Sequence, residues 1–62
     1  MEKKYEIGDK FLAKGCKEYG FLELKYVIEE DNRLFYILEN LKYKQTYKVP
    51  DTHINLFYYP EN

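Results

Sequence analysis

Aromatic residues fall in short runs in which apolar and polar side chains alternate, and this pattern constrains the fold more than any other feature. Eight tyrosines and four phenylalanines occur among 62 residues, without a tryptophan. Alternation with a period of two is typical of strands that bury one face. A chain this short needs large aromatic side chains, because few other residues bury so much area per position. We therefore expect an all-β protein that forms a single domain over residues 1–62, with residues 1–6 loosely held.

The alternation predicts four strands, at residues 9–14, 21–29, 34–39 and 42–49. In the second strand, one face carries Leu22, Leu24, Tyr26 and Ile28, and the other carries Glu23, Lys25, Val27 and Glu29. In the fourth strand, one face carries Tyr43, Gln45, Tyr47 and Val49, and the other carries Lys42, Lys44, Thr46 and Lys48. The third strand is apolar on both faces, as expected for a strand inside a sheet.

The segments between these strands predict turns. Asp31 and Asn32 tolerate the left-handed backbone of a tight hairpin. Pro50 ends the fourth strand, because proline cannot donate to a ladder. We expect one helical turn at residues 53–57 and a short extended piece at residues 58–60.

This order of elements is that of SH3-like barrels, and closure into a barrel would remove the exposed edges of a flat sheet. Residues 5–11 (YEIGDKF) resemble the opening segment of many SH3-like domains, and residues 49–57 (VPDTHINLF) resemble their closing turn and last strand. The whole chain is similar to small barrels encoded by phages and mobile elements of low-GC Gram-positive bacteria. The resemblance implies a five-stranded SH3-like barrel with one short helical turn before the last strand.

The chain departs from the SH3 domains that bind proline-rich peptides. It has neither an ALYDY-like segment nor the tryptophan of their groove. Binding of PxxP peptides is therefore not implied. A five-stranded OB-like barrel is the competing fold, although such domains usually need a longer chain and a helix between strands three and four.

Few residues offer catalytic or metal-binding chemistry. The chain has no serine, and its one cysteine and one histidine, Cys16 and His53, provide neither a disulfide nor a structural zinc site. These two side chains could form a nucleophile and a base, but no third group is evident to orient them. The acidic run Glu29-Glu30-Asp31 lies at a predicted hairpin tip, where we expect it to be solvated. The sequence predicts a protein that is not an enzyme and that needs no cofactor or metal.

Charge and hydropathy indicate where in the cell the chain is expected. Ten basic and eleven acidic side chains give a net charge of −1, with Arg33 as the only arginine, so nothing draws the chain toward nucleic acid or membrane overall. No apolar stretch resembling a signal peptide follows residues 1–4, and none approaches the length of a membrane span. A single free cysteine suits a reducing compartment, so we expect a cytoplasmic protein.

The first functional hypothesis is a protein-interaction module. Tyrosine is enriched in interface cores, because it is large, rigid and able to hydrogen-bond at its tip. The rings expected to keep an exposed face, and so to contact a partner protein, are Tyr5, Tyr19, Tyr36, Tyr58 and Tyr59. The alternative interpretation is that most of these rings cap the ends of the barrel.

The second hypothesis is nucleic-acid binding. It depends on an outward row of Lys42, Lys44 and Lys48, joined by Lys10, Lys14 or Lys25 from neighbouring strands. Tyr36 or Tyr58 would provide a stacking surface beside this row. Lysines on an exposed strand can instead protect an edge from pairing with other chains. Homodimerisation through an open edge or an aromatic patch is compatible with either hypothesis.

Overall fold

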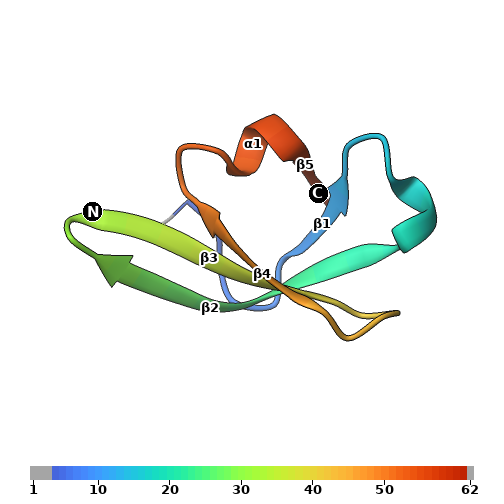
Figure 1. Cartoon of the computed structure of the whole chain (residues 1–62), viewed down its shortest axis with the longest axis horizontal. Coiled ribbons are helices and arrows are strands. Elements are labelled where there is room, and N and C mark those ends of the chain that lie inside the picture. The colour runs from blue at the N-terminus through green and yellow to red at the C-terminus, as the bar shows by residue number, and fades with distance from the viewer. Residues whose placement is uncertain (1–3, 62) are drawn as a thin grey trace.

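The computed structural model describes residues 4–61, which form one five-stranded antiparallel sheet (Figure 1). The strands are β1 (Lys10–Ala13), β2 (Phe21–Glu30), β3 (Arg33–Asn40), β4 (Thr46–Pro50) and β5 (Tyr58–Pro60). A 3-10 turn, η1 (Lys17–Tyr19), follows β1, and a helical turn, α1 (Ile54–Phe57), precedes β5. The predicted all-β class, with five strands and one helical turn before the last, is confirmed.

The sheet is curled into a half-barrel and is not closed. Its strand order is β4-β3-β2-β1-β5, so within residues 4–61 no ladder joins β4 to β5. The prediction of a closed barrel was wrong at this point. β5 has only three residues and contains Pro60, which has no amide proton for a ladder. The helical turn α1 instead spans the open side between the two edges (Figure 1).

One buried cluster holds the curled sheet and α1 together. Its members come from all strands except β5, and from α1; they are Phe11, Leu22, Leu24, Tyr36, Leu38, Val49 and Ile54. The buried residues of β3 alternate strictly along the strand, as the period-two pattern requires. Burial of each such side chain contributes about 1.5–3 kcal/mol, so this cluster is the main source of stability.

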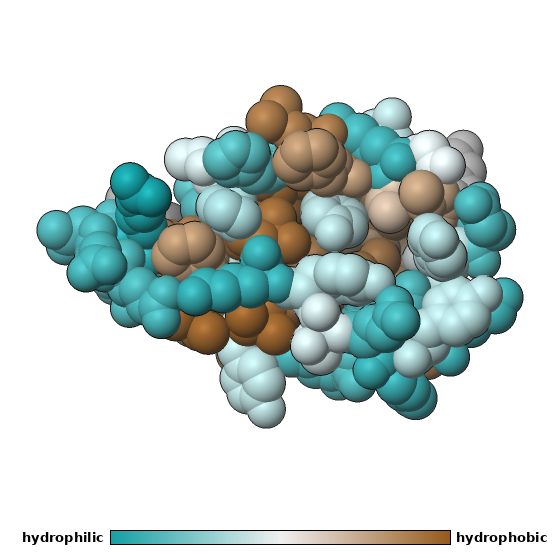
Figure 2. All heavy atoms as spheres, viewed as in Figure 1, coloured by the Kyte–Doolittle hydropathy of each residue, from teal (hydrophilic) through white to brown (hydrophobic). Residues whose placement is uncertain are grey.

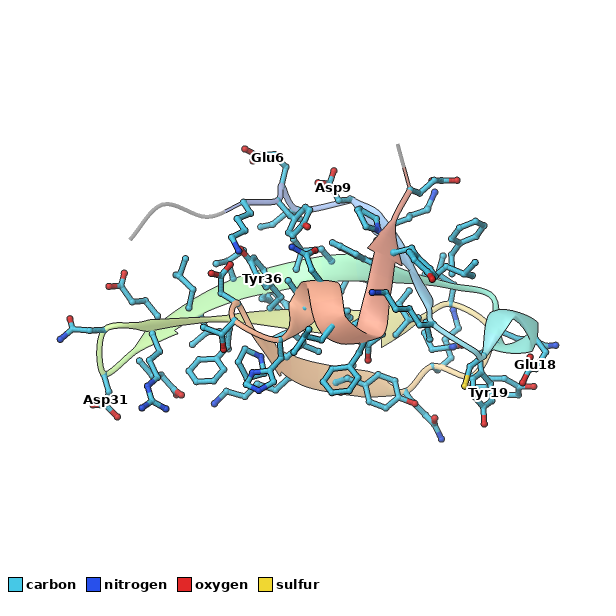
Figure 3. The ribbon with its side chains drawn as sticks, turned by 90° about the horizontal axis from the view of Figure 1, so that it is seen from above. Glu6, Asp9, Glu18, Tyr19, Asp31 and Tyr36 are labelled. Atoms are coloured by element: carbon cyan, nitrogen blue, oxygen red, sulfur yellow. The ribbon has the colours of Figure 1, made fainter. Side chains whose placement is uncertain are left out.

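The hairpin between β2 and β3 is the tightest connection. Glu30 pairs with Arg33, and the two residues between them have φ angles of 51° (Asp31) and 63° (Asn32). Two successive left-handed residues define the type I′ turn that suits the twist of a hairpin. The turn predicted from Asp31 and Asn32 is confirmed, and Asp31 marks the tip of the projecting hairpin in Figure 3.

A register shift changes which residues of β2 face inward. The pairing with β3 slips between Leu24 and Tyr26, which is the signature of a β-bulge. Beyond the shift, Val27 packs against the core, whereas the Tyr26 side chain is 65% exposed. The predicted face was therefore correct for Leu22 and Leu24 and wrong from Tyr26 onward, because one extra residue inverts the alternation.

The strand predicted at residues 42–49 begins later than expected. Residues 41–43 form a turn, and residues 44–45 lead irregularly into the strand, with a φ of 60° at Lys44. The side-chain oxygen of Asn40 accepts hydrogen bonds from the backbone amides of Lys42 (2.9 Å) and Tyr43 (2.7 Å). A side chain that captures nearby amides in this way competes with ladder pairing. Lys42 and Lys44 therefore do not belong to a strand, which corrects the prediction.

The N-terminal segment is attached to the half-barrel from residue 4 onward. The Lys4 amide donates to the Tyr36 hydroxyl (3.0 Å), and the Tyr5 ring makes edge contacts with Phe11 and Tyr36 at centroid distances of 4.9 and 5.7 Å. The Tyr5 hydroxyl donates to Asn55 (2.6 Å). The prediction that residues 1–6 are loosely held concerns, for residues 1–3, a part of the chain outside the described residues.

Candidate functional site

Two of the five predicted contact tyrosines belong to the interior. Tyr36 is fully buried, and its hydroxyl donates to Asp51 Oδ1 at 2.7 Å. Burial, followed by the hydrogen bond to Asp51, raises the pKa of Tyr36 from 10.0 to about 12. The prediction that Tyr36 exposes a ring for a partner or for base stacking was therefore wrong. Tyr5 is half-buried, with its ring packed against the same core.

The other three predicted tyrosines do not share one face. Tyr58 and Tyr59 are adjacent in β5, so their side chains point to opposite faces of the sheet. Tyr58 packs against the core from the concave side. Tyr59 is exposed, and the Lys14 ammonium lies 4.9 Å from the centre of its ring. Tyr19 lies in η1, at the end of the molecule opposite the hairpin tip (Figure 3).

A pocket of about 190 Å³ opens where the edges of the half-barrel face each other. We call it the seam pocket; its lining residues are Ala13, Cys16, Tyr19, Leu22, Asn40, Tyr47 and Tyr58. β4 contributes Tyr47 and β5 contributes Tyr58, so both edge strands meet at this pocket. Burial, followed by the proximity of Tyr47 and Cys16, raises the pKa of Tyr58.

Three partly exposed tyrosines form a rim beside the seam pocket: Tyr19 and Tyr47 line it, and Tyr43 contacts the Tyr19 ring. The exposed fractions are 47% for Tyr19, 50% for Tyr43 and 41% for Tyr47. The rings of Tyr19 and Tyr43 meet edge to face, with centroids 5.8 Å apart and an interplanar angle of 82°. Figure 2 shows hydrophobic and weakly polar side chains gathered between α1 and β4, bordered by hydrophilic ones.

Asn40 fixes the backbone that carries this rim. It is the one buried polar residue in the described part of the chain. Its side-chain nitrogen Nδ2 donates to the Tyr19 carbonyl oxygen (3.0 Å). Its side-chain oxygen accepts from the backbone amides of Lys42 and Tyr43 in the following turn. Sequence reasoning missed Tyr43 and Tyr47, because it placed them on one face of an unbroken strand with Val49. Asn40-Leu41 is a turn candidate in the sequence, but the strand after it begins at Thr46 and not at the predicted residue 42.

The predicted lysine row is also broken. Lys48 is the only one of the three in a strand. Its ammonium donates a hydrogen bond to the Glu30 carboxylate (2.7 Å) and lies 4.6 Å from the centre of the Phe35 ring. Lys42 lies in the turn, 5.3 Å from the centre of the Tyr43 ring. Lys25 is paired with Glu23 and Glu39. A continuous cationic stripe therefore does not form.

The two residues considered as a nucleophile and a base line different pockets. Cys16 is half-buried in the seam pocket. His53 lines a separate pocket of about 380 Å³, and its ring stacks on Phe57 with centroids 6.3 Å apart. Its Nδ1 atom lies 2.9 Å from the Thr52 hydroxyl. Among residues 4–61 we find no group of three side chains able to hold a metal ion, and no helix there is long and apolar enough to cross a membrane.

Comparison with protein families, with curated proteins and with solved structures finds no match for this chain. The geometry of the seam pocket and its tyrosine rim is therefore the basis for assigning a role.

Proposed function

We propose that this chain is a non-catalytic protein-interaction module that contacts its partner through the seam pocket and the rim formed by Tyr19, Tyr43 and Tyr47. The observation that carries the proposal is that exposed tyrosines from η1 and β4 line one pocket, and that Tyr43 from the β3–β4 turn packs against the first of them, Tyr19. Tyrosine anchors beside a pocket are typical of the energetic centre of protein interfaces. Asn40 holds the supporting backbone in place, which lowers the entropy cost of binding.

We further propose that the half-barrel is SH3-like. Its support is that β1 pairs with both β2 and β5, and that the one helical turn stands between β4 and β5. An OB-like barrel would have its helix between strands three and four, where this chain has only a short turn. The resemblance to barrels of phages and mobile elements suggests a host protein as the partner.

Affinity capture with matched tyrosine variants tests the interaction proposal. We expect Tyr19→Ala and Tyr43→Ala to weaken capture of the partner from a cell lysate by about tenfold or more each. Tyr26→Ala and Tyr59→Ala remove rings outside the rim that are more exposed than Tyr19 and Tyr43, and should leave capture unchanged. Circular dichroism should show that all four variants fold. Loss of capture that is equal in rim and control variants would contradict the proposal.

Nucleic-acid binding is the second candidate, and one observation favours it. The Lys42 ammonium lies over the Tyr43 ring, which is paired with Tyr19, so a cation and exposed rings share one place. Fluorescence anisotropy with single-stranded DNA and RNA tests it. Binding that weakens steeply between about 50 and 200 mM salt would favour nucleic acid over a protein partner.

A further inference from the structure

We propose that the outer edge of β4 binds an acidic, extended segment of the partner protein, which adds to the sheet as a further strand beside the seam pocket. This inference rests on the proposed function and specifies the chemistry of the partner. It follows from the backbone of the two edges, from the position of the pocket and from the distribution of charge.

The backbone of β4 presents unpaired groups on its outer side. The Asn40 amide donates to the Gln45 carbonyl, and the Asp51 amide donates to the Leu34 carbonyl. In the register that pairs Leu38 with Tyr47 and Tyr36 with Val49, the backbone amides and carbonyls of Tyr47 and Val49 face β3. The amides and carbonyls of Thr46 and Lys48 therefore point outward. Within residues 4–61 they have no backbone partner.

The edge of β5 cannot offer the same groups. The Lys14 amide donates to the Phe57 carbonyl, and the Glu61 amide donates to the Lys10 carbonyl. In this register, the backbone groups of Tyr58 and Pro60 point away from β1. The Tyr58 amide already donates to the Ile54 carbonyl, and proline has no amide proton. An added strand can therefore find outward donors on β4 and none on β5.

The seam pocket lies on the side that an added strand would cover. Val49 is buried in the core, so Tyr47, two residues earlier, faces the same concave side and lines the pocket. Side chains of an added strand alternate between the faces of the sheet. One set would therefore reach the pocket between Tyr47 and Tyr58, as in peptide recognition by strand addition.

The charge around this edge selects an acidic segment. Residues 41–50 contain three lysines and no acidic residue. The remainder of the chain then has 7 basic and 11 acidic side chains, a net charge of −4. Lys48 is paired with Glu30, and Asp51, which follows β4, is paired with Lys4, so the unpaired charge beside this edge is that of Lys42 and Lys44. Lys42 and Lys44 make no ion pair with any described residue, so both are available. A second copy of β4 would bring like charges together, which disfavours self-pairing.

Selection from a peptide library, followed by mapping on the full chain, tests this inference. The probe is a phage-displayed library of random peptides about six residues long, the usual length of a strand. We expect enriched peptides in which Asp or Glu alternates with apolar residues. With a synthetic enriched peptide, the NMR amide signals of Thr46 and Lys48 should shift and exchange more slowly with solvent. The single thiol, Cys16, should react more slowly with a thiol reagent when the peptide fills the pocket.

Backbone and charge variants make the test specific. N-methylation of the peptide at every second residue should weaken binding about tenfold in one register and little in the other, because only alternate amides face β4. Lys42→Gln with Lys44→Gln should weaken binding about tenfold, whereas Lys10→Gln, an exposed lysine of β1, should have no effect.

No enrichment, enrichment of neutral or basic peptides, tolerance of N-methylation in both registers, or shifts outside β4 and the seam pocket would each overturn the inference. Its failure is distinguishable from failure of the proposed function. Capture of the native partner that depends on Tyr19 and Tyr43, without any peptide pairing at β4, would leave the interaction module standing and remove only the strand addition.

Discussion

The two edges of the half-barrel differ in how they limit pairing with a further strand. β5 is blocked in its backbone, since the Tyr58 amide is used by α1 and Pro60 has no amide proton. β4 keeps its outward amides at Thr46 and Lys48, and the unpaired Lys42 and Lys44 lie just before it in the β3–β4 connection. An edge without free amide donors disfavours every added strand, whereas neighbouring lysines disfavour only a strand that carries positive charge. Under the proposed strand addition, this difference directs the added strand to β4 and not to β5.

On the β5 side of this comparison, substitution of Ile54 should have the largest effect on the free energy of unfolding. Ile54 is fully buried, and its carbonyl accepts the amide that closes the β5 edge. We expect Ile54→Ala to lower the free energy of unfolding by about 2–4 kcal/mol, through the lost burial and the cavity left behind. Leu56→Ala, an exposed neighbour in α1, should change it by about 0.5 kcal/mol or less. Urea denaturation of both variants measures the difference, and equal effects would show that α1 does not anchor β5.

Substitution of Asn40 should rank second and act on the β4 side. Asn40→Ala removes one donor and an acceptor that serves two amides, in a buried position. We expect a loss of about 2 kcal/mol in unfolding free energy. Gln45→Ala, beside the same turn but exposed, should cost about 0.5 kcal/mol or less. NMR shifts of Tyr19 and Tyr43 should move in the first variant only; unchanged shifts there would contradict the role of Asn40 in holding the rim.

Alkaline pH should weaken the end of β4, where Asp51 meets Tyr36. The pKa of Tyr36 is about 12 in the fold against the ordinary tyrosine value of 10.0, so its neutral form is stabilised by folding. This contribution is complete below pH 10 and is lost as pH rises from 10 through about 12. Tyr36→Phe should cost about 1 kcal/mol near neutral pH and should reduce the alkaline loss. Denaturation across this range provides the measurement, with Tyr59→Phe as the control; an equally steep alkaline loss in Tyr36→Phe would exclude Tyr36 as its source.

Hydrogen exchange of the native protein should reveal the edge pattern without altering stability. On β4, the amides of Tyr47 and Val49 should be protected, while those of Thr46 and Lys48 exchange rapidly. On β5, both Tyr58 and Tyr59 should be protected, because α1 holds the first and β1 the second. NMR exchange rates check this. Uniform protection along β4 would mean that its outer side is already covered.

The sequence was most informative where local chemistry determines the backbone. Asp31-Asn32 specifies its turn, and Pro50 ends β4, because these preferences need no distant partner. The bulge near Lys25 could not be foreseen, since it depends on how β2 meets β3 in space. The same holds for Tyr36, whose burial depends on Asp51 and on the N-terminal segment. The seam pocket combines residues from both ends of the chain, so alternation alone could not locate it.

Asn40 also has an evolutionary consequence. A single carboxamide anchors both η1, which carries Tyr19, and the turn that carries Tyr43, and neither ring contributes to the core. Each ring can therefore be exchanged by mutation at little thermodynamic risk, while the platform beneath them stays intact. Descendants of this protein could acquire new ligand preferences through positions 19 and 43, provided that position 40 remains asparagine.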